Sequence, residues 1–192
     1  IFCDRYGVTD WAEKLSGVYG MGNDDIMGRI LPEEVIREKG LAALAAEKEE
    51  IYREIYAPEI RPVEGLRELL GRLRTAGVRC AVGSSGCRAN VDFVLEKCGI
   101  GDFFDARISG DTVTRCKPDP EIYLKAAEAL RLRPEECVVF EDARAGIEAG
   151  DRAGMKVVAL ATTLSREELE RTAATLVIDD FTQMSVERLR SL

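Results

Sequence analysis

The stretch CKPDPEIYLKAAEALRLRPEECVVFEDARAGIEAGDRAGMKVVAL, residues 116–160, decides the fold of this chain. Two apolar runs within it, at 137–140 and 157–160, have the length of buried strands. Helix-like patterns precede the first run at 119–130 and join the two runs at 143–154. Strands that alternate with helices predict βαβ units, so the stretch predicts a parallel sheet with helices on both faces.

The same alternation extends to both sides of this stretch. Further strands are expected upstream and downstream, each beside a helix-like pattern. The expected strands are 78–85 (VRCAVGSS), 105–109 (DARIS) and 175–180 (TLVIDD), and the expected helices are 65–77, 90–99 and 166–173. The predicted fold class is therefore α/β, with a Rossmann-like parallel sheet.

The first third of the chain has a different pattern. From Trp11 to Tyr56, apolar residues recur at three- and four-residue spacing among strong helix formers, which predicts a helical lobe. Prolines and a glycine in the segment 57–65 (APEIRPVEG) predict a linker. The short apolar run before Asp4 predicts an isolated first strand. The expected domains are an α/β core formed by 1–4 and 58–192, and a helical lobe at 5–57.

The composition excludes several classes of function. A formal net charge of −8 argues against nucleic acid, whose phosphates require a basic face. The sequence has no histidine, which excludes Ser-His-Asp and Cys-His catalysis and zinc sites built on imidazole. The six cysteines show no CxxC spacing, which argues against a disulfide or metal framework. No apolar run approaches the ~20 residues of a membrane span and the start is not signal-like, so we expect a cytoplasmic protein without a membrane partner.

Polar residues that suit phosphoryl transfer follow four of the strand-like runs. In an open parallel sheet, ligands bind outside the carboxyl ends of the strands. Carboxylates placed there can bind Mg²⁺ or attack phosphorus, while a lysine and hydroxyls neutralise and orient the phosphoryl oxygens. The candidates are Asp4, Ser84, Ser85, Lys117, Glu141 and Asp142.

Each candidate also has a structural interpretation. Asp119 and Pro120 suit the N-terminus of the next helix, and Asp142 could cap the helix that begins near Ala143. The two serines could satisfy loop amides. Lys117 is harder to explain in this way, because a helix cap requires no lysine two residues earlier. The functional interpretation rests on all of the candidates falling at strand ends.

The motifs of the chain resemble those of a known family. The combination of K-P-D-P at 117–120 with E-D-x-x-A-G-I-x-A at 141–149 is similar to the haloacid dehalogenase (HAD) superfamily. The likeness is to its β-phosphoglucomutase-like phosphatase branch, which has a small helical cap inserted after the first strand. It extends from GVYGMGNDDIMGRIL (17–31) in the cap to LVIDDF (176–181). The resemblance therefore implies a HAD-like core and identifies the helical lobe as the cap.

The resemblance also assigns roles to the candidates. It implies that Asp4 is the nucleophile and a Mg²⁺ ligand, and that Lys117 stabilises the phosphorylated aspartate. Ser84 matches the phosphate-binding hydroxyl of the second motif, with Ser85 beside it. Glu141 and Asp142 match the acidic metal-binding pair of the fourth motif.

The cap contributes further candidates by the same resemblance. Lys48 falls where related enzymes place a substrate-facing lysine, and its alternative is a solvated helix lysine. Asn23 falls where relatives that act on a bisphosphorylated sugar place an arginine. Because an asparagine lacks that charge, this position favours hydrolysis over a mutase reaction.

The first motif is where the resemblance breaks down. The family has D-x-D-G-[TV], whereas this chain reads DRYGVTD from Asp4. One alignment places Tyr6 on the second aspartate, and another places Cys3 on the nucleophile and Arg5 on the acid. Because RYGVTDW resembles the end of a first cap helix, we hypothesise that residues are absent between Asp4 and Arg5. A continuous chain at this junction would contradict the hypothesis and favour a defective first motif.

The sequence therefore predicts a Mg²⁺-dependent phosphatase for a small phosphorylated metabolite, such as a sugar phosphate, acting through an aspartyl-phosphate. A β-phosphoglucomutase is the alternative enzyme. The alternative without turnover is a protein that binds phosphorylated ligands through an incomplete site. We expect a monomer or a weak dimer.

Overall fold

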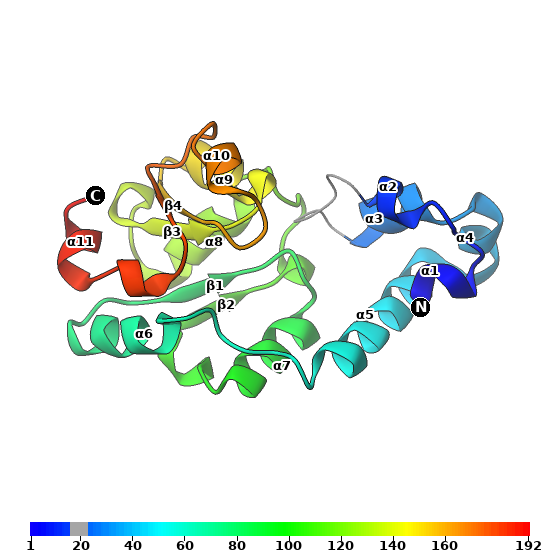
Figure 1. Ribbon diagram of the computed structural model, residues 1–192, viewed down its shortest axis with the longest axis horizontal. Coiled ribbons are helices and arrows are strands. Elements are labelled where there is room, and N and C mark those ends of the chain that lie inside the picture. Colours follow the sequence, from blue (N-terminus) through cyan, green and yellow to red (C-terminus); the bar gives the residue numbers. More distant parts are fainter. Residues whose placement is uncertain (16–22) are drawn as a thin grey trace.

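The computed structural model describes residues 1–15 and 23–192, which form a helical cap and an α/β core (Figure 1). Residues 17–22 of the cap segment 17–31 that contributes to the resemblance therefore lie outside the described residues. The described cap helices are α1 (Phe2–Arg5), α2 (Trp11–Lys14), α3 (Asn23–Ile30), α4 (Glu33–Lys39) and α5 (Leu41–Tyr56). Among the described residues, no helix combines the length and apolarity that a membrane span requires.

The core follows the linker and alternates helices with strands as expected. Its strands are β1 (Ala81–Gly83), β2 (Ala106–Ile108), β3 (Val138–Glu141), β4 (Lys156–Leu160) and β5 (Leu176–Ile178). Its α-helices are α6 (Leu66–Thr75), α7 (Arg88–Cys98), α8 (Glu121–Leu130), α9 (Arg144–Arg152), α10 (Arg166–Leu169) and α11 (Val186–Arg190). Short 3₁₀ turns are η1 (Gly101–Phe103), η2 (Gly110–Thr112), η3 (Pro134–Glu136) and η4 (Phe181–Gln183).

All strand pairs described are parallel, which confirms the predicted fold class, but the strands form two sheets. One sheet pairs β1 with β2, and the other has the order β3-β4-β5. No ladder joins β1 to β3 in the described part of the chain, so each of these strands has one edge without a strand partner. Helix α8 contacts β1 and β2, and α9 contacts β3 and β4.

The apolar faces of these elements form the core. One cluster fills the space between β3, β4, α8 and α9, where Ile122, Ile147 and Val157 are each about 1% exposed. A second cluster on the other face of the sheet packs α6 and α11 against Val158 and Ile178. Burial on both faces explains why the strands read as continuous apolar runs in the sequence.

The predicted first strand at 1–4 is wrong. Residues 2–5 form helix α1, and the Phe2 side chain is buried in the cap cluster with Met27 and Leu44. The Phe2 ring also packs edge-on against Tyr6, with 5.2 Å between ring centroids. Burial of Phe2 against cap helices therefore assigns this stretch to the cap.

The hypothesis of residues absent between Asp4 and Arg5 stays a prediction, because the structure contains the residues of the printed sequence alone. Helix α1 runs through the junction, and the Arg5 amide donates to the Ile1 carbonyl at 3.2 Å. The interpretation of RYGVTDW as part of the cap holds, but it extends to the residues before Arg5. The core domain is accordingly formed by residues after the linker, within the described ranges.

Gly65 provides a test of the docking of α6 against the C-terminal segment. It has φ +76°, and a Cβ at this position would lie 2.5 Å from the Thr182 amide nitrogen. We expect Gly65→Ala to lower the free energy of unfolding by about 1–3 kcal/mol, because both the backbone strain and the clash must be relieved. The matched control is Gly71→Ala within α6, where a Cβ meets nothing within 4 Å. Urea unfolding should show this control to be stabilised by up to about 1 kcal/mol, and equal effects of the two changes would contradict the packing described.

Candidate active site

Lys117 lies at the carboxyl ends of both sheets. Its Nζ donates to the carbonyl of Gly83, the last residue of β1, at 3.2 Å. The same Nζ forms an ion pair with Oε1 of Glu141, the last residue of β3. Lys117 is 7% exposed. One buried ammonium group therefore connects the ends of the two strands that share no ladder.

Glu141 is held by several donors besides Lys117. The Tyr123 hydroxyl donates to its Oε1 at 2.7 Å, and the amides of Asp142 and Ala143 donate to its Oε2 at 3.0 and 3.2 Å. Burial raises the pKa of Glu141, but Lys117, Tyr123 and the amide donors outweigh it and hold the pKa below its ordinary value. The carboxylate is therefore ionised, and each of its two oxygens accepts hydrogen bonds.

Tyr123 is the neutral member of this group. Burial is the larger cause and the nearby Glu141 carboxylate the smaller one, and together they raise the pKa of Tyr123 well above its ordinary value. The phenol therefore stays protonated and donates a hydrogen bond. The Lys117 ammonium also lies over the Tyr123 ring, 4.7 Å from its centroid. The ring and the hydroxyl thus contact both charges of the ion pair.

A glycine on α9 makes room for the Glu141 side chain. A Cβ at Gly146 would lie 2.0 Å from the Glu141 Cδ. Only a glycine therefore fits where α9 approaches this carboxylate. This contact gives a steric reason for the glycine in the A-G-I part of the fourth motif.

The loop after β1 brings the two predicted serines to the same end of the sheet. The Ser84 amide donates to the Ile108 carbonyl at 3.0 Å, and its hydroxyl accepts from the Gly86 amide at 3.1 Å. The Ser85 hydroxyl oxygen is buried and has no hydrogen-bond partner among the described residues. Because a buried polar group without a partner is costly, this hydroxyl is suited to a bound ligand.

Asp142 projects from the end of β3 toward the loop after β4. Its Oδ2 accepts from the hydroxyls of Thr162, at 3.1 Å, and Thr163. Unlike Glu141, its neighbour at the end of β3, Asp142 makes no ion pair with Lys117 in the described part of the chain. Its oxygen chemistry suits Mg²⁺.

The complete magnesium set predicted from the sequence does not assemble. Across residues 1–15 and 23–192, no three acidic or cysteine side chains come close enough to hold a metal ion together. Glu141 is engaged by Lys117, and Asp4 lies elsewhere. The described residues therefore do not by themselves fit a bound metal ion.

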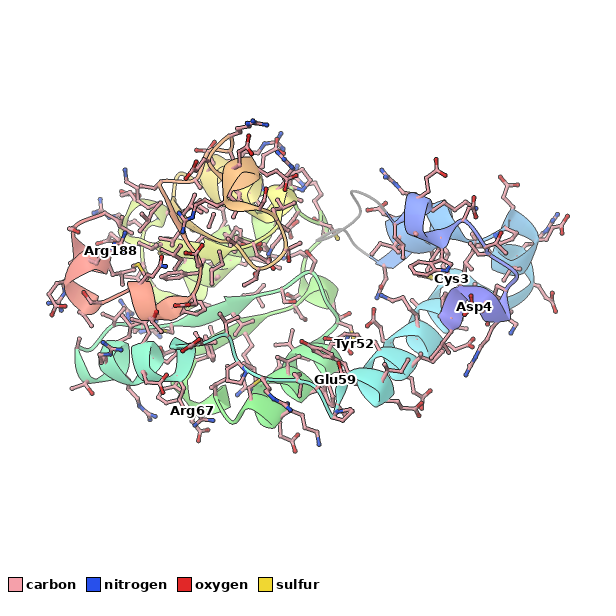
Figure 2. All side chains as sticks on the ribbon, in the orientation of Figure 1. Cys3, Asp4, Tyr52, Glu59, Arg67 and Arg188 are labelled. Carbon is pink, nitrogen blue, oxygen red and sulfur yellow. The ribbon has the colours of Figure 1, made fainter. Side chains whose placement is uncertain are left out.

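The structure places Asp4 on the cap, far from Lys117. Its side chain is 68% exposed. Figure 2 shows Asp4 and Cys3 on the cap, away from the sheets. The predicted role of Asp4 as nucleophile and metal ligand required a strand beside β1 and β3, and α1 does not provide one. Cys3, the nucleophile of the other alignment, is excluded by the same placement.

The two cap candidates lie together around a buried acid. Glu49 is 6% exposed, pairs with Lys48 Nζ at 2.5 Å and is hydrogen-bonded by the Asn23 side chain. Burial opposes its ionisation, but Lys48, Asn23 and Asn90 together hold the pKa of Glu49 below its ordinary value. Asn23 and Lys48 are thus brought together by Glu49, and their roles toward a substrate stay predictions.

Sequence reasoning missed several residues that the site uses. Tyr123 occupies an apolar position of its helical pattern, so its hydroxyl gave no separate signal. Thr162 and Thr163 follow the strand-like run KVVAL almost directly, and the search for polar residues after strands could have found them. Glu49 gave no signal, because one glutamate among many charged residues of α5 is unremarkable in sequence.

Comparison with known proteins decides the family. The family model described as haloacid dehalogenase-like hydrolase matches residues 4–154. The chain belongs to the haloacid dehalogenase-like hydrolases. A relative in this family is the validoxylamine A 7'-phosphate phosphatase of Streptomyces hygroscopicus subsp. limoneus, which is 39% identical over 127 residues. The match covers 66% of this chain and 59% of that protein.

Solved structures of HAD hydrolases have the same fold. The β-phosphoglucomutase of Clostridium difficile is 27% identical, with a TM-score of 0.81, and the match covers 99% of this chain and 85% of that one. CbbY of Rhodobacter sphaeroides, solved in complex with phosphate, is 25% identical, with a TM-score of 0.83. That match covers 98% of this chain and 88% of CbbY. These neighbours confirm a HAD core with a helical cap.

The chain is shorter than the curated relatives it matches. It spans between 16% and 59% of the length of the first four of them.

The ion pair at the strand ends can be tested by stability. Lys117→Met should lower the free energy of unfolding by about 3–5 kcal/mol, because it leaves the buried Glu141 carboxylate without its cation. The double variant Lys117→Met/Glu141→Gln should recover part of that loss. The control is Arg171→Met, whose pair with Glu167 is largely exposed and should contribute less than about 1 kcal/mol. Denaturant unfolding gives all three values, and a double variant less stable than Lys117→Met would contradict the described pairing.

Glu121 gives a prediction of pH dependence for the loop before Lys117. A hydrogen bond from Lys125, followed by bonds from Thr114 and Arg115, lowers the pKa of Glu121 from 4.5 to about 2. Because the folded-state pKa is depressed, the stabilisation is present above 4.5 and is lost as the pH falls toward about 2. Unfolding measured across that window should depend less on pH in Glu121→Gln than in the wild type. Glu128→Gln, an exposed change on the same helix, is the control, and equal slopes for all three proteins would contradict the assignment.

Proposed function

We propose that this HAD hydrolase cleaves phosphate monoesters of small metabolites, with sugar phosphates as the substrate class. The observation that carries the proposal is the buried Lys117 ammonium at the carboxyl ends of β1 and β3, beside the Ser84–Ser85 loop. A cation, hydroxyls and loop amides at one sheet end suit a phosphoryl group. Glu141 and Tyr123 hold Lys117 in this position.

The nucleophile in this proposal comes from a strand that pairs between β1 and β3. Both strands present an unpaired edge, and Lys117 contacts the ends of both. A carboxylate at the end of such a strand would lie beside Lys117 and the serines. It would attack phosphorus and break the ester P–O bond, and the departing alkoxide would take a proton from water. Water would then attack the aspartyl-phosphate, releasing orthophosphate and the carboxylate.

The relatives support this substrate class. One is named a validoxylamine A 7'-phosphate phosphatase, and a Thermotoga maritima relative is named a phosphorylated carbohydrates phosphatase. CbbY has been solved in complex with xylulose-(1,5)bisphosphate. A mutase reaction is the second candidate, since β-phosphoglucomutase is a structural neighbour. The uncharged Asn23, bound to Glu49, favours hydrolysis over that alternative.

We expect the reaction to depend on Mg²⁺, although the described residues do not by themselves form a complete metal site. Asp142 would contribute one carboxylate, and the remaining ligands would come from the added strand. We expect the enzyme to work in the cytoplasm, as a monomer or a weak dimer. Its six cysteines are free thiols.

The proposal is tested with the complete natural polypeptide and a panel of phosphate esters, with and without Mg²⁺. Lys117→Ala and Asp142→Asn should each lower kcat/KM by about 100-fold or more, because each removes a charge at the phosphoryl site. Asp4→Asn should leave kcat/KM within about twofold, because Asp4 lies on the cap surface. Orthophosphate release separates hydrolysis from isomerisation of β-glucose 1-phosphate.

A large loss in Asp4→Asn would contradict the placement of the site. Absence of turnover across the panel, with phosphate still bound, would favour the interpretation of a ligand-binding homologue.

A further inference from the structure

One side chain of the core contacts two charged residues of the cap. Asn90, on α7, donates through Nδ2 to Oε2 of Glu49 on α5. Its Oδ1 accepts from Nη1 of Arg53, also on α5, at 2.8 Å. Glu49 and Arg53 are four residues apart, so they lie on the same face of the helix. The asparagine amide therefore donates to an acid and accepts from a base of the other domain, both on α5.

The contact lies where the cap meets the core. Figure 1 shows the C-terminal half of α5 approaching α7, and Tyr52, one turn after Glu49, lies at this junction in Figure 2. Helix α5 ends at Tyr56, and the linker to α6 follows directly. In the described residues the backbone passes from cap to core through this linker. Side-chain contacts beside it therefore bear on the orientation of the cap.

The chemistry of the contact suits a joint that opens. Burying the charge of Glu49 is unfavourable unless it is fully paired, so an apolar contact would serve rigidity better. Hydrogen-bonded groups, by contrast, exchange their partners for water when the domains separate. Interfaces between domains that move are typically polar in this way.

The contact lies between the two groups of candidate site residues, those of the core and those of the cap. Asn90 is the third residue of α7, a helix that follows the Ser84–Ser85 loop. Glu49 holds the Lys48 ammonium and the Asn23 side chain. The position of the cap groups relative to the phosphate loop thus depends on Glu49 and Asn90.

We propose that Asn90 and the Glu49–Arg53 pair form a polar latch that holds the cap over the phosphate loop, and that Glu49 is a positioning residue for Lys48. The latch goes beyond the proposed function, and its role for Lys48 rests on that function. Opening the cap transfers Asn90, Glu49 and Arg53 to water. Closing the cap restores the three partners and aims Lys48 at the space above the serines.

The latch is tested by the distance between cap and core in the complete polypeptide. Trp11, the single tryptophan of the sequence, lies on the cap and serves as a Förster donor. A dansyl-bearing residue at the exposed position Lys97 of α7 is the acceptor. We expect Asn90→Ala and Glu49→Ala each to lower the transfer efficiency, and the double variant to lower it no further. The controls are Glu50→Ala on α5 and Glu96→Ala on α7, both exposed, which should leave it unchanged.

Glu49→Gln separates the latch from the positioning of Lys48. A glutamine keeps an acceptor for Asn90 but has no charge for Lys48, so energy transfer should stay near that of the wild type. With an ester that the enzyme turns over, KM should rise about five- to tenfold with kcat changed less than twofold. Glu49→Asp keeps the negative charge on a shorter side chain, so its KM should lie between that of the wild type and that of Glu49→Gln.

The outcomes distinguish the two proposals. Unchanged energy transfer in Asn90→Ala and in Glu49→Ala, each with a cooperative thermal unfolding transition, overturns the latch. An additive loss in the double variant also overturns it, because the two residues would then act separately. If no ester is turned over, the proposed function fails, while the energy transfer still decides the latch. An unchanged KM in Glu49→Gln overturns the positioning role alone.

Discussion

The structure depends on one buried ion pair between Lys117 and Glu141. A buried ammonium and a buried carboxylate are favourable together only when their remaining hydrogen-bonding groups also have partners. Here the partners are the Gly83 carbonyl, the Tyr123 hydroxyl and the amides after Glu141. The pair therefore fixes the ends of β1 and β3 relative to each other, although no ladder joins these strands.

Much of the core could be predicted because its signals are long and redundant. The alternation of apolar strands with helices, and the rule that ligands bind at strand ends, led to Lys117, Glu141 and Asp142. The N-terminal stretch failed for the opposite reason. Four residues such as IFCD fit a strand or a helix equally well, and burial of Phe2 against the cap decided between them. Asp4 was then given the role of nucleophile from its neighbours in the sequence rather than from its surroundings in the fold.

In the proposed function, specificity would be a property of two domains rather than one. The phosphate loop and Lys117 belong to the core, whereas Lys48 and Asn23 belong to the cap. A substrate that contacts both must meet them at one spacing, and small changes in that spacing have large effects on a bound ester. Polar contacts such as that of Asn90 with Glu49 would define this spacing when the cap is closed and would still allow the cap to open. No signal in the sequence indicated this contact, because it joins two residues that lie 41 positions apart on different helices.

We propose that the carboxyl ends of β1 and β3, around Lys117, form the phosphoryl site. A crystal structure of the protein with orthovanadate or tungstate tests it most directly. The account predicts the anion within about 2.7–3.2 Å of the Lys117 ammonium and a hydroxyl of Ser84 or Ser85. An anion bound only at another place, such as the cap around Lys48, would contradict it.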